Sequence, residues 1–252
     1  MPGDLALLHH TFQLRLATID HLAALSNRSY KQTEKRLVKL EGQHYVRCLT
    51  RRPRKYIYTL GRSGSAALIE HGFAPRELAT VRLRQNELKE FGLRHAVFIS
   101  DIHVKLLTLL RGGTSLALTH WAEGPSLWDS VTTGENVTIP IRPDAWFVIG
   151  AGQGSHHFFL EADRGTMAHS RMREKISGYA AYFQQQRHVK KYEGMKVFRV
   201  ATITETRGRA KGLTDEFRAM MPATWLTAYP VIAFEDLTLR TLIPKHGENS
   251  HR

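Results

Sequence analysis

Residues 139–149, IPIRPDAWFVI, and residues 155–163, SHHFFLEAD, decide the fold of the second half of this chain. Both segments have the apolar and β-branched character of strands, and the AGQG turn between them indicates a β-hairpin. Acids lie along it: Asp144 in the first strand, and Glu161 and Asp163 in the second. Because Glu161 and Asp163 are two residues apart, they project from the same face of a sheet.

Strand and helix patterns alternate on both sides of this hairpin. The predicted elements are a helix over about 94–110, a strand over about 115–122, the hairpin itself, a long helix over about 168–187 and the strand KVFRVATIT. The order is therefore α-β-β-β-α-β, an α+β or α/β arrangement. A helix over 207–221 and a strand at Val231–Phe234 follow, and the tail at 241–252 is expected to be disordered.

The first 72 residues are predicted to form a domain of their own. Its expected elements are a helix over 4–14, a short helix capped by Thr18, a helix over 30–41 capped by Ser29 and ended by Gly42, the strands HYVRCLT and KYIYTL, and a helix over 62–71. This order is typical of a winged helix-turn-helix, whose third helix enters the major groove of DNA while the hairpin tip contacts phosphate. The charged residues 73–92 are predicted to be a linker, helical or not, so the second domain covers 93–240.

The charge of the chain favours an anionic partner. Lys and Arg total 36 against 23 Asp and Glu, which gives a formal net charge of +13. Double-stranded DNA is the first candidate, because each phosphate that a cation neutralises releases a counterion. The residues expected to contact DNA lie on the outward side of the third helix and at the hairpin tip: Arg28, Tyr30, Lys31, Gln32, Lys35, Arg51, Arg52, Arg54 and Lys55. A domain that binds another protein is the alternative.

Other classes of protein find little support. No uninterrupted apolar run reaches about 18 residues, so no membrane span is expected. The single cysteine, Cys48, excludes an internal disulfide and fits a reducing, cytoplasmic location, where we expect it to be a small core residue. No phosphate-binding G-x-x-x-x-G-K-[ST] loop is present, which argues against an ATPase.

The acids of the hairpin are the candidate chemistry. If Asp144 neighbours Glu161, three carboxylates meet, and such a group is stabilised by a hard divalent cation such as Mg²⁺ or Mn²⁺. Asp101, in the preceding helix, is considered as a fourth ligand. A site of this kind could cut a phosphodiester bond. The alternative is that the acids are solvated charges or ion-pair partners of Arg142 and Arg164.

This pattern resembles the PD-(D/E)xK nuclease superfamily, with Pro143-Asp144 on the second strand and Glu161-Ala162-Asp163 on the third. Asp163 stands where the superfamily has a lysine that orients water and offsets charge. Lys175, in the following helix, could supply that ammonium group from a migrated position. Tyr179, which shares its helix face, and Tyr182 are alternative nucleophiles to a metal-activated water.

Over residues 5–212 the chain resembles the replication-relaxation family of mobile-element proteins. The segments that carry the resemblance are LATIDHLAALSNRSYKQTEKRLVKLEGQHYVRCL, YIYTLGRSGSAAL, LRHAVFISDIHVKLL and IRPDAWFVI…FFLEADRGT…KISGYAAYF. The chain is also similar to the MobC-type mobilisation relaxases, which have a winged helix ahead of a nuclease-like domain.

These resemblances imply metal-dependent DNA nicking in plasmid or mobile-element replication, mobilisation or relaxation. The catalytic residues would be Asp144, Glu161, Asp163, Lys175 and Tyr179. The alternative is a non-catalytic replication accessory or transcriptional regulator with a degenerate nuclease-like domain, and a nonspecific basic DNA binder is a third interpretation. Whether the chain forms a homodimer or joins other mobilisation or replication proteins stays open.

Overall fold

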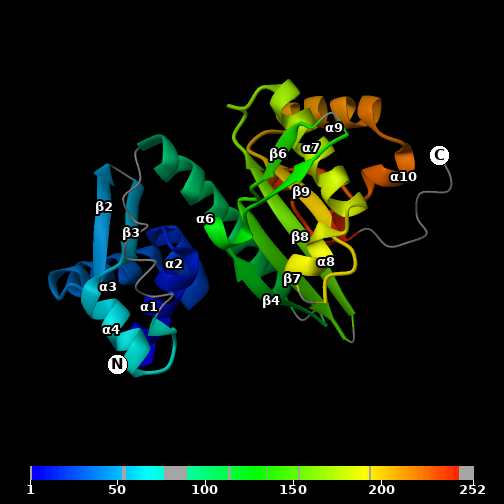
Figure 1. The fold of residues 1–252 in the computed structure, drawn as a ribbon. Helices are drawn as coiled ribbons and strands as arrows, with labels where there is room; N and C mark the ends of the chain where they lie inside the picture. Colours follow the sequence, from blue (N-terminus) through cyan, green and yellow to red (C-terminus); the bar gives the residue numbers. More distant parts are fainter. Residues whose placement is uncertain are drawn as a thin grey trace. The chain divides into compact units, whose positions relative to one another are not determined.

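The structure of the chain is a computed structural model that describes residues 2–52, 55–76, 90–112, 115–134, 136–152, 154–192 and 194–243. The chain divides into two compact units, residues 1–108 and 109–252. Both units combine helices with sheets (Figure 1). Among the described residues, no helix has the length and apolar character needed to cross a membrane.

The N-terminal unit consists of helices around a three-stranded sheet. Its elements are α1 (Pro2–Leu14), β1 (Ala17–Thr18), α2 (Ile19–Ser26), α3 (Tyr30–Gly42), β2 (Val46–Arg52), β3 (Lys55–Leu60), α4 (Arg62–Glu70) and most of α6 (Glu90–Leu110). The strands pair antiparallel in the order β1-β3-β2. The core is made of leucines from four helices, among them Leu7, Leu22, Leu37 and Leu68.

The helix starts in this unit follow from the sequence. Thr18 and Ser29 were predicted to be N-caps, and the structure confirms both, because each hydroxyl accepts a hydrogen bond from the backbone N–H three residues later. Asn27 turns the chain between the two helices with a left-handed backbone, at φ 51°. Gly42 does not end α3 as expected, because the helix includes it and Gln43 is its C-cap.

The division between the units differs from the predicted linker. The predicted linker, 73–92, lies mostly outside the described residues, since 77–89 are not described. The division falls instead after Thr108, within α6. The reason is that α6 packs on the N-terminal core: the Ser100 hydroxyl donates to the carbonyl oxygens of Leu14 and Leu16, and Val104 joins the leucine cluster.

The C-terminal unit is built on a five-stranded sheet in the order β10-β9-β8-β7-β4. Its strands are β4 (Leu116–Ala122), β5 (Asp129–Thr132), β6 (Thr138–Ile141), β7 (Ala145–Ala151), β8 (Gly154–Asp163), β9 (Arg199–Thr204) and β10 (Val231–Ala233). β4, β7 and β8 are antiparallel, whereas β8, β9 and β10 run parallel. β5 and β6 form a separate antiparallel pair.

The helices α7 (His169–Gln184) and α9 (Arg207–Met220) cover one face of this sheet. The other helices described in this unit are α8 (Arg187–Lys191), α10 (Ala223–Leu226) and α11 (Leu239–Leu242), with 3-10 turns at Pro125–Leu127 and Phe234–Asp236. Figure 1 shows α7 and α9 beside β9. Phe159 and Val200 of the sheet share one apolar cluster with Tyr179 of α7 and Leu213 of α9. The next residue of the same alternation in β8 is Glu161, which therefore lies under these helices.

Three predicted elements differ in the structure. The strand predicted over 139–149 is two strands, β6 and β7, because Arg142-Pro143-Asp144 interrupts the ladder and proline lacks the N–H that a central strand needs. The helix over 168–187 divides at Gln186, whose φ is 52°. The tail from 241 begins inside α11, and 244–252 lie outside the described residues.

Gly64 gives a test of the N-terminal packing. A Cβ atom at Gly64 would lie 2.1 Å from the backbone oxygen of Tyr45, whereas one at Gly42 would meet nothing within 4 Å. We expect Gly64→Ala to lower the free energy of unfolding by about 1–3 kcal/mol. Gly42→Ala should instead raise it by about 0.5–1 kcal/mol, as for alanine in any helix. Urea unfolding measures both, and equal stabilities of the two variants would contradict this packing.

Candidate functional site

Asp144 is held at the start of β7, against the end of β8. Its backbone N–H donates to the carbonyl oxygen of Leu160 at 2.9 Å, and its Oδ2 accepts from the N–H of Ala162 at 2.8 Å. These two bonds surround Glu161 in the neighbouring strand. The structure therefore places Asp144 beside Glu161, as expected from two strands joined in a hairpin.

Glu161 lies beneath α7, where only 2% of it is exposed. Lys175 forms an ion pair with its Oε2, and the hydroxyl of Tyr179 donates to its Oε1 at 2.7 Å. Lys175 and Tyr179 are four residues apart and so project from one side of the helix. The structure thus brings together four of the predicted site residues: Asp144, Glu161, Lys175 and Tyr179. We call these four the acid–lysine cluster.

Burial sets the charge state of the acid–lysine cluster. Desolvation, with the nearby carboxylate of Asp144, raises the pKa of Glu161 from its ordinary 4.5 to about 7, although Lys175 and Tyr179 favour the ionised form. Desolvation disfavours the ammonium of Lys175, but the carboxylates of Glu161 and Asp144 outweigh it and raise the pKa of Lys175. Perturbed groups of this kind concentrate at functional sites.

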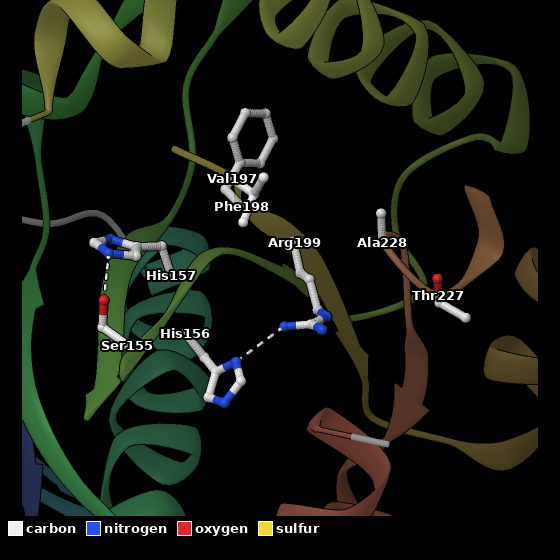
Figure 2. Close-up of a pocket in the computed structure, with 8 residues that line it drawn as sticks. All are labelled: Ser155, His156, His157, Val197, Phe198, Arg199, Thr227 and Ala228. Carbon is white, nitrogen blue, oxygen red and sulfur yellow. Dashed lines mark hydrogen bonds between the residues drawn. The ribbon is translucent and has the colours of Figure 1, made fainter. Parts of the chain in front are cut away.

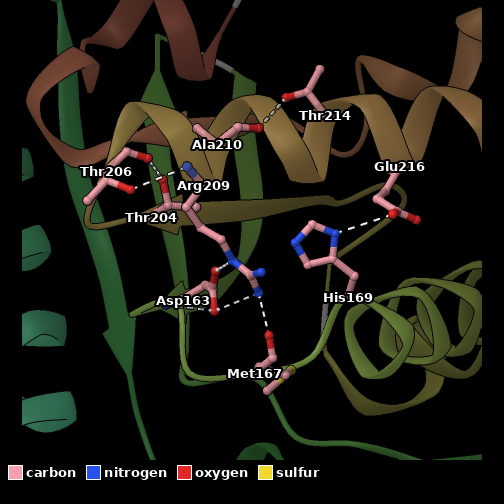
Figure 3. Close-up of polar contacts among 10 residues, drawn as sticks. Asp163, Met167, His169, Thr204, Thr206, Arg209, Ala210, Thr214 and Glu216 are labelled. Atoms are coloured by element: carbon pink, nitrogen blue, oxygen red, sulfur yellow. Dashed lines mark hydrogen bonds and ion pairs between the residues drawn. The ribbon is translucent and has the colours of Figure 1, made fainter.

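Asp163 does not complete a group of three carboxylates. Although it projects from the same face as Glu161, Arg209 of α9 donates to its Oδ2 at 2.6 Å and also bonds the carbonyl oxygen of Met167 (Figure 3). Beside this pair, His169 and Arg173 share the carboxylate of Glu216. The expectation of three convergent carboxylates is therefore corrected, because α9 supplies a cation that takes the third.

Asp101 has a partner in the N-terminal unit. Its Oδ1 lies 2.5 Å from Nε2 of His21, whose Nδ1 accepts from the N–H of Thr18 in the cap of α2. The structure thus gives Asp101 a role in positioning a helix start, in place of the predicted metal ligand. Among the described residues, no group of three or more His, Cys, Asp or Glu side chains is arranged to hold a metal ion.

The two tyrosines have different surroundings. The hydroxyl of Tyr182 donates to Oδ2 of Asp129 at 3.1 Å, so this side chain lies outside the acid–lysine cluster. Tyr179 is 1% exposed, and burial with the negative charge of Glu161 raises the pKa of its hydroxyl well above the usual range. A buried hydroxyl that keeps its proton is a poor nucleophile. Tyr179 is therefore better suited to positioning Glu161 than to attacking DNA.

Four of the predicted DNA-contacting residues lie exposed on α3. Tyr30 is 40% exposed, and Lys31, Gln32 and Lys35 are exposed along α3. Arg28 is half-buried, with its guanidinium near the carbonyl oxygen of Gly3. The Oε1 of Gln32 accepts from the N–H of Ser29, so a base contact by Gln32 would compete with the capping of its own helix.

The predicted hairpin tip lies at the edge of what the structure describes. Arg51, Arg52 and Lys55 belong to β2 and β3, with Arg52 opposite Lys55, but only their backbones are described. Arg54 lies outside the described residues. Their contact with DNA stays a prediction.

Two features of the site were missed from the sequence. Arg209 comes from a helix 46 residues after Asp163, and no local spacing signals the pair. Thr202 lies opposite Glu161 in the register of β8 and β9, and its buried Oγ1 has no hydrogen-bond partner among the described residues. The only signal for Thr202 was the strand pattern of KVFRVATIT, which gives no register.

Taken together, these features define a two-unit α/β protein with a buried acid–lysine cluster at the end of a mixed sheet. A family profile described as replication-relaxation matches residues 8–198, more than half of the chain. The chain therefore belongs to the replication-relaxation family, which suggests a role in the replication or relaxation of mobile elements. Searches among curated proteins and among solved structures found no match.

The raised pKa of Glu161 predicts a pH dependence of stability. The folded chain keeps this proton up to about pH 7, whereas the unfolded chain loses it near 4.5. The folded state then binds more protons in that window, so the contribution of Glu161 to the free energy of unfolding falls as the pH rises through it. We therefore expect the free energy of unfolding of the wild type, compared with that of Glu161→Gln, to fall as the pH rises from about 5 to about 8. Denaturant unfolding across this range, which includes the raised pKa of about 7, measures the difference.

The matched control is Glu174→Gln, which changes an exposed carboxyl on the same helix. Its stability should follow that of the wild type at every pH. Parallel pH profiles for the wild type and Glu161→Gln would show that Glu161 ionises as it does in the unfolded chain.

Proposed function

We propose that this chain is a metal-dependent DNA-nicking protein that acts in mobile-element replication, mobilisation or relaxation. In this proposal the N-terminal unit is a winged helix that finds the DNA, and the C-terminal unit is a PD-(D/E)xK-like domain related to those of MobC-type relaxases. The observation that carries it is the contact of Lys175 with Glu161 beside Asp144.

Lys175 supplies the positive charge that Asp163, as an acid, cannot supply. The PD-(D/E)xK pattern needs a cation near its acids, and Asp163 stands where the lysine is expected. Lys175 brings an ammonium group to Glu161 from the following helix. In the proposed reaction this ammonium offsets charge on the phosphate, while the hydrogen bond from Tyr179 orients Glu161.

The donor set of the cluster fits a hard divalent cation, Mg²⁺ or Mn²⁺. Mg²⁺ is usually held by one or two carboxylates, with water and phosphate oxygens filling its other positions. Asp144 and Glu161 would be those carboxylates, and the hydroxyl of Thr202, which has no hydrogen-bond partner in the described part of the chain, lies opposite Glu161. When bound, the cation would activate water and stabilise charge on the phosphate. Asp163 would keep its ion pair with Arg209.

The rest of the chain agrees with a DNA substrate. The formal net charge is +13, and Lys31 and Lys35 on α3 are exposed with no ion pair among the residues that the structure describes. The order of α1, α2, α3, the β2–β3 hairpin and α4 supports the assignment of a winged helix-turn-helix.

A non-catalytic DNA-binding protein is the second candidate. It is favoured because two of the acids already have partners within the chain. Lys175 and Tyr179 bind Glu161, and Arg209 forms an ion pair with Asp163. An ion-pair network of this kind can serve only to fix the sheet to its helices.

Nicking of a supercoiled plasmid separates these two functions. The plasmid should carry the origin of the host element, with Mg²⁺ or Mn²⁺ present. We expect Asp144→Asn to reduce the rate of nicking by more than about a hundredfold. Loss of a residue that only orients a metal ligand already lowers metal affinity or activity by about 10–100-fold. Lys175→Met should reduce it by about 10²–10³-fold through lost charge stabilisation. Glu174→Gln, exposed on the same helix as Lys175, should nick normally. If the wild type and Asp144→Asn behave alike, the acid–lysine cluster is not catalytic.

Salt dependence tests the two DNA-contacting regions of the winged helix. The triple change of Arg51, Arg52 and Arg54 to Ala should weaken binding to every sequence and lower the slope of log K against log salt by about 0.9 per lost phosphate contact. Lys31→Ala should instead alter the preference among sequences. Binding isotherms at several salt concentrations measure both. An equal loss on all sequences from Lys31→Ala would remove α3 from base recognition.

A further inference from the structure

A pocket of about 170 Å³ lies at the start of β8 (Figure 2). The acid–lysine cluster lies at the other end of this strand. Ser155 and His156, at the start of β8, form one side of it, and Arg199, the first residue of β9, forms another. Thr227, in the segment before β10, completes its polar rim. Since His156 is five residues before Glu161 in an extended strand, the pocket is separate from the carboxylates by about 16 Å.

Arg199 is a cation that pairs with no carboxylate among the described residues. Its guanidinium is half-buried, 5.9 Å from the centre of the Phe158 ring, and burial lowers the pKa of Arg199. It forms no ion pair among the described residues, and no acid lines the pocket. Removing such a charge from water is costly unless an anion approaches it. The planar guanidinium, with several N–H donors, suits the paired oxygens of a phosphate.

His156 extends the set of donors. One N–H of Arg199 donates to Nδ1 of His156 at 3.3 Å, so this nitrogen is unprotonated. The neutral ring then carries its proton on Nε2, which makes that atom a donor. The pocket therefore offers the guanidinium and an imidazole N–H to a ligand, while the Ser155 hydroxyl contacts Nε2 of His157 and Thr227 lies at the exposed rim. A metal ion would meet the positive charge of Arg199, so this chemistry favours an anion.

We propose that this pocket binds a phosphate group, through the guanidinium of Arg199 and the donors beside it. The phosphate comes from a nucleic-acid strand or from free phosphate. The proposal does not depend on catalysis by the acid–lysine cluster, since the two sites occupy opposite ends of β8 and share no residue.

The sharpest test changes the exposed rim and leaves the core intact. Thr227→Glu places a carboxylate where it competes with a phosphate for Arg199, and Thr227→Gln adds nearly the same volume without charge. Arg199→Gln removes the cation itself, while Arg218→Gln removes an exposed arginine whose partner is Asp215. The full-length chain is titrated with inorganic phosphate by calorimetry, against chloride at equal ionic strength, and with a short labelled oligothymidylate by fluorescence anisotropy.

We expect Thr227→Glu and Arg199→Gln to weaken phosphate binding by about tenfold or more, while Thr227→Gln and Arg218→Gln bind as the wild type does. If only oligothymidylate shows this pattern, the site takes its phosphate from a strand. If both probes bind all variants equally, or neither binds the wild type, the proposal is overturned. Nicking is read separately through Asp144→Asn, so failure of either proposal leaves the other standing.

Discussion

The burial of one carboxylate, Glu161, is the constraint on which the C-terminal unit depends. A charge that is 2% exposed is tolerated only when it is paired and hydrogen-bonded, and here both oxygens of Glu161 have donors from α7. These bonds fix the rotation of α7, whose inner side then carries Tyr179 onto the ring of Phe159. Gly178 lets the helix approach β6, since a Cβ there would lie 2.7 Å from Ile139. The polar site and the apolar core are therefore one packing arrangement.

Most of the fold could be predicted from periodicity and turn residues. The hairpin of β7 and β8, the caps at Thr18 and Ser29 and the order of the main strands and helices follow from local sequence. The short strands β1 and β5 were missed, because two to four residues give no period, and they exist only through pairing with β3 and β6. The split at Pro143 was missed because the apolar pattern continues through it.

The candidate site was predictable only where it is local. Spacing along β8 placed Glu161 and Asp163 on one face, and helical spacing placed Lys175 and Tyr179 together. What each acid contacts depends on the elements that cover it, and these are distant in sequence. Arg209 therefore pairs with Asp163, and His21 pairs with Asp101, although both acids had been considered as metal ligands beside Asp144 and Glu161. The role of a carboxylate therefore depends on the residues that contact it, and those contacts come from the tertiary fold.

In the proposed function, the distribution of paired and unpaired cations would separate the attraction of DNA from the chemistry on it. Lys175 and Arg209 are neutralised by their own acids, so they add little to the long-range field of the chain. Lys31 and Lys35 on α3 have no such partners among the described residues, and neither does Arg199. A strand would thus be drawn first to the exposed cations of α3. A phosphate could engage Lys175 only by competing with Glu161, whose pKa near 7 makes that exchange sensitive to protonation at neutral pH.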